Sequence, residues 1–187
     1  MIDRSILDAK RAHLAGLLEA IQRCVYFLDA STRKLTWPLS AEFLEQRKKD
    51  VGLFEAMAAI NERFAKLQDT MSAAMRHASL LAGESGDTFL QVLGFYEKAG
   101  VLESVVSWQL CRTARNLAAH DYETEYADIA DHFNSLHALT PLLYADAYRF
   151  VDYCQATLAI APRQLDFSDS FVFIVKNNPK NDGYESD

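Results

Sequence analysis

Apolar residues recur at steps of three and four through most of the chain, which is the period of an amphipathic helix. The clearest stripe lies in residues 57–81, where the apolar positions are Met57, Ile60, Phe64, Leu67, Met71, Ala74, Ala78 and Leu81. Alternating steps of three and four are typical of a helix that packs nearly parallel to its neighbours. The pattern predicts an all-α protein, an antiparallel helical bundle of four to five helices.

Capping and breaking residues divide the first half of the chain. A helix is expected over residues 3–29, with a buried seam of Leu14, Leu17, Ile21, Cys24 and Leu28. A loop over residues 31–39 follows, and Ser40 is a suitable N-cap for a short helix over residues 41–49. After a break at residues 83–86, Asp87 is expected to cap the next helix, and Gly100 fits the left-handed position that ends it.

Two further helices are expected over residues 103–119 and 124–160, with Pro141 kinking or splitting the second. The apolar positions of that second helix are Ile129, Phe133, Leu136, Leu143, Ala147, Phe150, Cys154 and Leu158. Residues 1–162 therefore form the predicted bundle. The C-terminal arm, residues 163–187, contains a stretch from Ser170 to Val175 that favours a strand or an extended arm. Residues 177–187 are polar and predicted to be disordered.

Composition and charge limit the class of protein and its expected location in the cell. The chain has 187 residues, half of them apolar, which is enough for one core, and it shows neither a membrane-spanning apolar run nor a signal peptide. Its three cysteines are far apart in sequence, so a reducing cytoplasm is the expected location. The net charge of −7 argues against a general nucleic-acid binder. If the protein handles RNA, it needs a local positive cleft.

Residues 115–122, Arg-Asn-Leu-Ala-Ala-His-Asp-Tyr, combine four chemical functions near the end of a predicted helix. The guanidinium of Arg115 can grip a phosphate in a bidentate fork. The imidazole of His120 titrates near neutral pH and can move protons. Together they suffice for cleaving RNA without a metal. The simpler interpretation is a solvated surface arginine and a histidine that interacts with the helix dipole.

A helical wheel constrains this site. The predicted core stripe of the 103–119 helix is Val106, Leu110, Thr113 and Leu117. Arg115 lies almost opposite, beside Trp108 and Arg112, so the arginine face is expected to point away from this subunit's own core. His120 lies roughly 140° further around the wheel. The two groups converge only if the helix ends near Ala119, or if two chains dimerise across this face and pool their side chains.

The stretch resembles the Arg-x4-His-x-Tyr signature of the HEPN superfamily, in particular its HepT-like toxins. The matching positions are Arg115, His120 and Tyr122, with Asn116 in the frequent polar position after the arginine. The turn-containing stretch before the motif and the long helix after it also resemble the family, over about residues 57 to 155. The loop at 31–39 and the tail beyond 163 depart from the family pattern.

The resemblance implies a HEPN-type bundle that dimerises across the motif helices and cleaves RNA (tRNA or mRNA) as a metal-independent endoribonuclease. Arg115, His120 and Asn116 would be its catalytic residues. Arg112, three residues before Arg115, would extend the RNA-binding surface in such a mechanism, and its simpler interpretation is a surface cation. The family often supplies the toxin of a toxin–antitoxin pair, with a minimal nucleotidyltransferase (MNT) antitoxin. Some such antitoxins transfer AMP to the motif tyrosine, here Tyr122, whose simpler interpretation is a partly buried packing residue.

Other groups of polar residues give weaker evidence for a functional site. Asp128 and His132 lie one helical turn apart, but no third ligand follows at a convincing spacing, so a surface charge pair is the better interpretation. We therefore expect no metal and no cofactor. The main alternative from another class is a non-catalytic HEPN subunit that binds nucleotide or substrate for a nucleotidyltransferase. A helical interaction protein with a structural motif is a third alternative.

Overall fold

The computed structural model describes residues 4–84, 87–117 and 125–178, and this part of the chain contains seven helices and no strand. The all-α prediction is confirmed. The helices are α1 (Arg4–Thr32), α2 (Ala41–Gln46), α3 (Val51–Leu81), α4 (Phe89–Lys98), α5 (Val105–Leu117), α6 (Tyr126–Leu158) and α7 (Ser168–Asn177).

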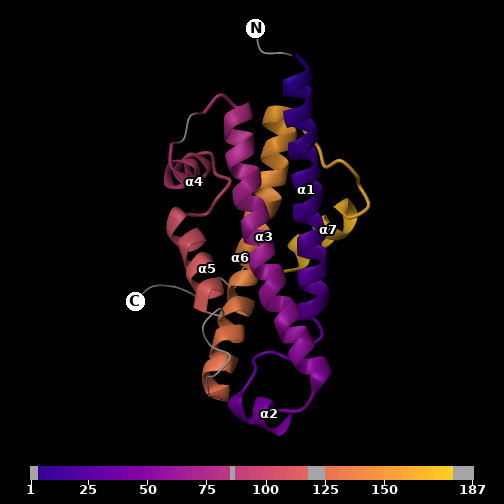
Figure 1. Cartoon of the computed structure of the whole chain (residues 1–187), viewed down its shortest axis with the longest axis vertical. Coiled ribbons are helices and arrows are strands. Elements are labelled where there is room, and N and C mark those ends of the chain that lie inside the picture. Colours follow the sequence, from indigo (N-terminus) through magenta and orange to yellow (C-terminus); the bar gives the residue numbers. More distant parts are fainter. Residues whose placement is uncertain (1–3, 85–86, 118–124, 179–187) are drawn as a thin grey trace.

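Three long helices, α1, α3 and α6, lie side by side, with α1 antiparallel to α3 and α6, which run in the same direction (Figure 1). Helices α4 and α5 lie along one side of this bundle, α7 lies on the other, and α2 closes one end (Figure 1). The interior is a single apolar cluster to which all seven helices contribute. Its largest fully buried side chains are Trp108, Tyr96, Tyr144, Phe64, Phe150 and Phe171.

The stripe predicted for α3 is confirmed, since seven of its eight positions are buried and Leu81 is partly buried. On α1 the seam is slightly rotated. Leu14, Ile21 and Leu28 are buried as expected, but Leu18 and Val25 replace Leu17 and Cys24 as its fully buried members.

Helices α2, α3 and α4 each start with a side-chain cap. The Ser40 hydroxyl accepts a hydrogen bond from the backbone N–H of Phe43 at 3.2 Å, as predicted. Asp50 caps α3 in the same way. The cap of α4 is Thr88 rather than the predicted Asp87, because Thr88 and Gln91 form a reciprocal capping box. Gly100, with φ of 71°, takes the predicted left-handed position after α4.

The second half of the chain departs from the predictions in two places. Of the two outcomes predicted for Pro141, a kink or a split, the split does not occur, because α6 continues as one helix of 33 residues. The stretch from Ser170 to Val175 is helical, in α7, because Phe171 and Ile174 pack one turn apart into the core while Phe173 stays exposed. The predicted disorder beyond Asn177 falls almost wholly on residues 179–187, which lie outside the described residues.

Two arginines join α1 to the end of α6 and to the chain that follows it. The guanidinium of Arg11 donates to the carbonyls of Leu158 and Ala159, both at 3.0 Å. Arg163 donates from its guanidinium to the Ala12 carbonyl at 3.1 Å and from its backbone N–H to the Ala15 carbonyl at 3.0 Å. The first helix is thereby bound to a segment about 150 residues later in the sequence.

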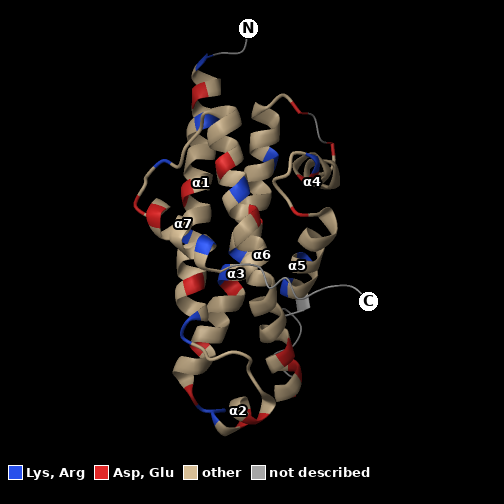
Figure 2. Cartoon of the chain, turned by 180° about the vertical axis from the view of Figure 1, so that it is seen from behind, with Lys and Arg blue, Asp and Glu red and all other residues tan. Residues whose placement is uncertain are grey.

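Charged residues are interspersed over the surface. On the face seen from behind, basic and acidic positions alternate along the long helices, without a continuous basic stripe (Figure 2). Within the described residues, none of the helices combines the length and the apolar character needed to cross a bilayer.

Candidate functional site

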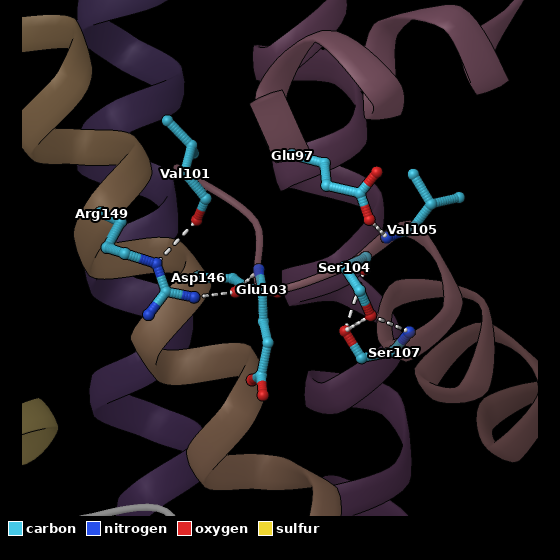
Figure 3. Close-up of polar contacts among 8 residues, drawn as sticks. All are labelled: Glu97, Val101, Glu103, Ser104, Val105, Ser107, Asp146 and Arg149. Atoms are coloured by element: carbon cyan, nitrogen blue, oxygen red, sulfur yellow. Dashed lines mark hydrogen bonds and ion pairs between the residues drawn. The ribbon is translucent and has the colours of Figure 1, made fainter. Parts of the chain in front are cut away.

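The helix that carries the arginine of the motif, α5, is fixed at its first turn by side chains (Figure 3). The Ser104 hydroxyl accepts from the backbone N–H of Ser107 at 2.9 Å, which is an N-cap interaction. Glu97 of α4 accepts from the backbone N–H of Val105 at 2.8 Å. Two of the N–H groups that every helix leaves unpaired at its start are satisfied in this way.

The turn between α4 and α5 is held against α6 (Figure 3). Asp146, which is 1% exposed, pairs with Arg149 and accepts from the backbone N–H of Glu103 at 3.2 Å. Arg149 also donates to the Val101 carbonyl at 2.8 Å. These contacts set the position from which α5 starts and therefore the place where its last turn, with Arg115, lies.

The buried face of α5 is not the predicted one. Trp108, Cys111 and Ala114 are buried. Val106 and Leu110, which belonged to the predicted core stripe, are 78% and 55% exposed. Both sides of this helix carry apolar residues, and the indole, which has the larger area to bury, takes the interior.

Residues of α3 hold the buried face of α5. The buried amide of Gln68 on α3 donates to the Trp108 carbonyl at 3.0 Å.

The other two residues of the predicted stripe do not restore it. Thr113 is exposed, and the side chain of Leu117 lies outside the described residues. The face that carries Trp108 is thus the inner face of α5.

Arg115 accordingly points toward its own subunit, against the prediction that it faces away from the core. Its side chain is 20% exposed and forms an ion pair with Asp69 of α3, whose side chain is 61% exposed. The same guanidinium nitrogen, Nη1, donates to the Ala65 carbonyl at 3.3 Å. The guanidinium therefore lies at the edge of the contact between α3 and α5, partly open to solvent.

Of the other predicted site residues, Asn116 and Arg112 lie within the described part of the chain, and His120 and Tyr122 do not. Asn116 is exposed, and its Oδ1 accepts from Nε of Arg115 at 3.4 Å, so these two side chains lie together. Arg112 is exposed and bonds to no other described residue. His120 and Tyr122 lie outside the described residues, as does the predicted helix end near Ala119.

Sequence reasoning missed the groups on α3 that surround the arginine. Asp69 is 46 residues before Arg115, and nothing in the local pattern connects them. Gln68 offered a signal in the sequence, because it is a polar residue next to the stripe position Leu67, and in the structure it is 2% exposed. A polar side chain on the buried edge of a helix needs a hydrogen-bond partner, and here that partner is the backbone of α5.

Neither a nucleophilic thiol nor a metal centre is found beside this site in the described residues. Burial, together with the negative charge of Asp146, raises the pKa of Cys111 to about 12, so its thiol stays protonated. The same part of the chain holds no group of three metal-ligating side chains. In the described residues the site therefore consists of Arg115, its acceptors on α3 and Asn116.

Comparison of the chain with family models, with curated proteins and with solved structures gave no match.

Proposed function

We propose that this protein is a metal-independent endoribonuclease of the HEPN type, acting as the toxin of a toxin–antitoxin pair. In this proposal two copies form the working enzyme, with an MNT-type nucleotidyltransferase as the antitoxin. The proposal is supported by the Arg-Asn-x3-His-x-Tyr stretch and by the all-helical architecture. The observation that carries it is the position of Arg115, a partly open cation in the last turn of a helix, immediately before the sequence that contains His120.

The chemistry follows from the residue types. The 2′-hydroxyl oxygen of RNA attacks the adjacent phosphorus, and the bond from phosphorus to the 5′-oxygen of the next nucleotide breaks. His120 takes the proton of the hydroxyl or gives one to the leaving oxygen. Arg115 holds the phosphate and stabilises the extra negative charge of the transition state. Asn116 orients the phosphate or the imidazole, and Arg112 extends the positive surface along the strand.

The test is RNA cleavage by purified protein, paired with growth of bacteria that express the chain alone. Arg115→Ala and His120→Ala are each expected to lower the cleavage rate by about 10²–10⁴-fold, because each removes a positioned group. Both variants should also relieve toxicity. Lys49→Ala, which removes an exposed cation between α2 and α3, is the control for a general effect of charge. Undiminished cleavage by either motif variant would refute the mechanism.

A second proposal concerns Tyr122. Attaching AMP to its hydroxyl would add bulk and a negative phosphate beside the cation, and so block RNA. Mass spectrometry of the chain after co-expression with its neighbouring nucleotidyltransferase would detect a mass increase on the peptide that contains Tyr122. An unmodified peptide from a neutralised toxin would mean that the antitoxin inhibits by binding alone.

One observation favours the non-catalytic alternative, a HEPN subunit that binds nucleotide or substrate for a nucleotidyltransferase. Arg115 is already paired with a carboxylate, which offsets part of its positive charge. Such a subunit would accumulate harmlessly when expressed alone and would bind nucleotide without cleaving RNA. Toxicity that His120→Ala relieves distinguishes the enzyme from the binding subunit.

A further inference from the structure

The hydrogen bonds of Arg115 leave one edge of its guanidinium available. Nη1 is fully used, because it donates to the Asp69 carboxylate and to the Ala65 carbonyl. Nε donates to Asn116 at 3.4 Å, which is at the long limit for a hydrogen bond. Nη2 donates to no other residue that the structure describes. The edge formed by Nε and Nη2 is therefore the one that can take a phosphate in a bidentate fork.

The two acceptors of Nη1 lie on the same stretch of α3 that holds the backbone of α5. Ala65 and Asp69 are four residues apart and share one helix face. Gln68, between them, binds the Trp108 carbonyl two turns before the arginine. One stretch of α3 thus fixes both the course of α5 and the direction of the guanidinium at its end.

We propose that Asp69 is a positioning residue for Arg115. Its carboxylate holds Nη1 so that the Nε–Nη2 edge faces the scissile phosphate, and it does not itself touch RNA. This inference rests on the proposed ribonuclease function. A guanidinium on a long side chain otherwise samples many rotamers, and ordering it beforehand lowers the entropic cost of reaching the transition state.

Asp69 also has an opposite effect on substrate binding. Its carboxylate is largely exposed and negative, so it repels the incoming phosphate as well as orienting the cation. The two effects are separable by substitution. Asp69→Asn keeps an oxygen that accepts from Nη1 and removes the charge, whereas Asp69→Ala removes both.

The experiment measures kcat and KM for cleavage of one RNA by wild type, Asp69→Ala and Asp69→Asn. Asp69→Ala is expected to lose about tenfold or more in kcat, because a misdirected group weakens transition-state contacts. Asp69→Asn should keep kcat within about threefold and lower KM, since an acceptor remains and the repulsion is gone. The matched control is Glu62→Ala, which removes an exposed carboxylate two turns earlier on the same face of α3. It should leave kcat unchanged.

Two results would overturn the positioning role: full kcat in Asp69→Ala, or an equal loss of kcat in Asp69→Asn and Asp69→Ala. If Asp69→Ala does not fold, as judged by circular dichroism, Asp69→Asn alone decides, by keeping or losing kcat. Arg115→Ala is assayed in the same series. If it also cleaves normally, the ribonuclease proposal fails as a whole. If it is inactive while Asp69→Ala is fully active, only the positioning role is refuted.

Discussion

The side-chain amide of Asn134 binds both backbone polar groups of Leu39. Its Oδ1 accepts from the Leu39 N–H at 2.8 Å, and its Nδ2 donates to the Leu39 carbonyl at 2.9 Å. This arrangement imitates the pairing of a neighbouring strand and attaches the loop before α2 to the side of α6. Leu39 is 4% exposed, so water has little access to these two backbone groups.

Asn134→Ala is therefore expected to destabilise the protein by about 1–3 kcal/mol, the usual cost of leaving buried polar groups unsatisfied. Chemical denaturation followed by circular dichroism measures this change. Ser135→Ala, at the next and exposed position of α6, is the control and should change stability by less than about 0.5 kcal/mol. Equal stability of the two variants would mean that the loop is held mainly by apolar packing.

The same loop is also joined to α6 by a stacked aromatic pair, and one ring of this pair can titrate. The rings of Trp37 and His137 lie 4.2 Å apart at an interplanar angle of 7°. Nδ1 of His137 is buried with no hydrogen-bond partner among the described residues, and burial lowers the pKa of the imidazole below its ordinary 6.5. The unfolded chain therefore binds this proton more readily than the folded chain does, so stability falls as the pH drops below 6.5.

His137→Phe keeps an aromatic ring for the stack and cannot titrate. Its free energy of unfolding should depend less on pH than that of wild type between about pH 7 and pH 5. Urea denaturation at several pH values measures both curves. Parallel curves for the two proteins would show that His137 contributes nothing to acid sensitivity.

The two faces of α5 should respond differently to truncation. Trp108 is 1% exposed, and Trp108→Ala is expected to cost about 3–5 kcal/mol because it opens a large cavity. Val106 is 78% exposed, and Val106→Ala should change stability by less than about 0.5 kcal/mol. Urea denaturation of the two variants compares the faces directly. A larger loss of stability in Val106→Ala than in Trp108→Ala would mean that the core stripe first predicted from the sequence is the buried one.

The three thiols should differ in reactivity. Cys111 and Cys154 are buried, and burial raises the pKa of each thiol to about 12. Cys24 is only partly buried, and its pKa is also raised, mainly by that burial. Since the thiolate is the reactive form, all three should react slowly with a disulfide reagent at pH 8, with Cys24 first. Denaturant should expose all three. Rapid labelling of Cys111 or Cys154 in the native protein would contradict their burial.

The sequence was most informative where structure depends on neighbours along the chain. The α3 stripe, the Ser40 cap and the left-handed Gly100 all follow from local periodicity and local hydrogen bonding, and all are confirmed. The α7 prediction failed for the opposite reason. The β-branched and aromatic residues of that segment favour a strand intrinsically, but docking of Phe171 and Ile174 against the bundle requires a helix.

The candidate site was only partly predictable. Arg115 and Asn116 were identified by residue type and spacing, and the structure brings their side chains together. The direction of Arg115 was mispredicted, because α5 offers two apolar stripes and a helical wheel cannot decide which one packs inside. Asp69 reaches Arg115 only through the packing of α3 on α5, and such long-range pairings leave no periodic trace in one sequence.

The contacts of Arg11 and Arg163 have a consequence for folding kinetics. They join α1 to residues about 150 positions later, so a very long loop must close before they form. We expect them to be absent from the folding transition state. Arg163→Ala should then speed unfolding in stopped-flow experiments and leave the refolding rate nearly unchanged. The lifetime of the native state thus depends on Arg163, a residue that leaves the ribosome only after helices α1 to α6 have been made.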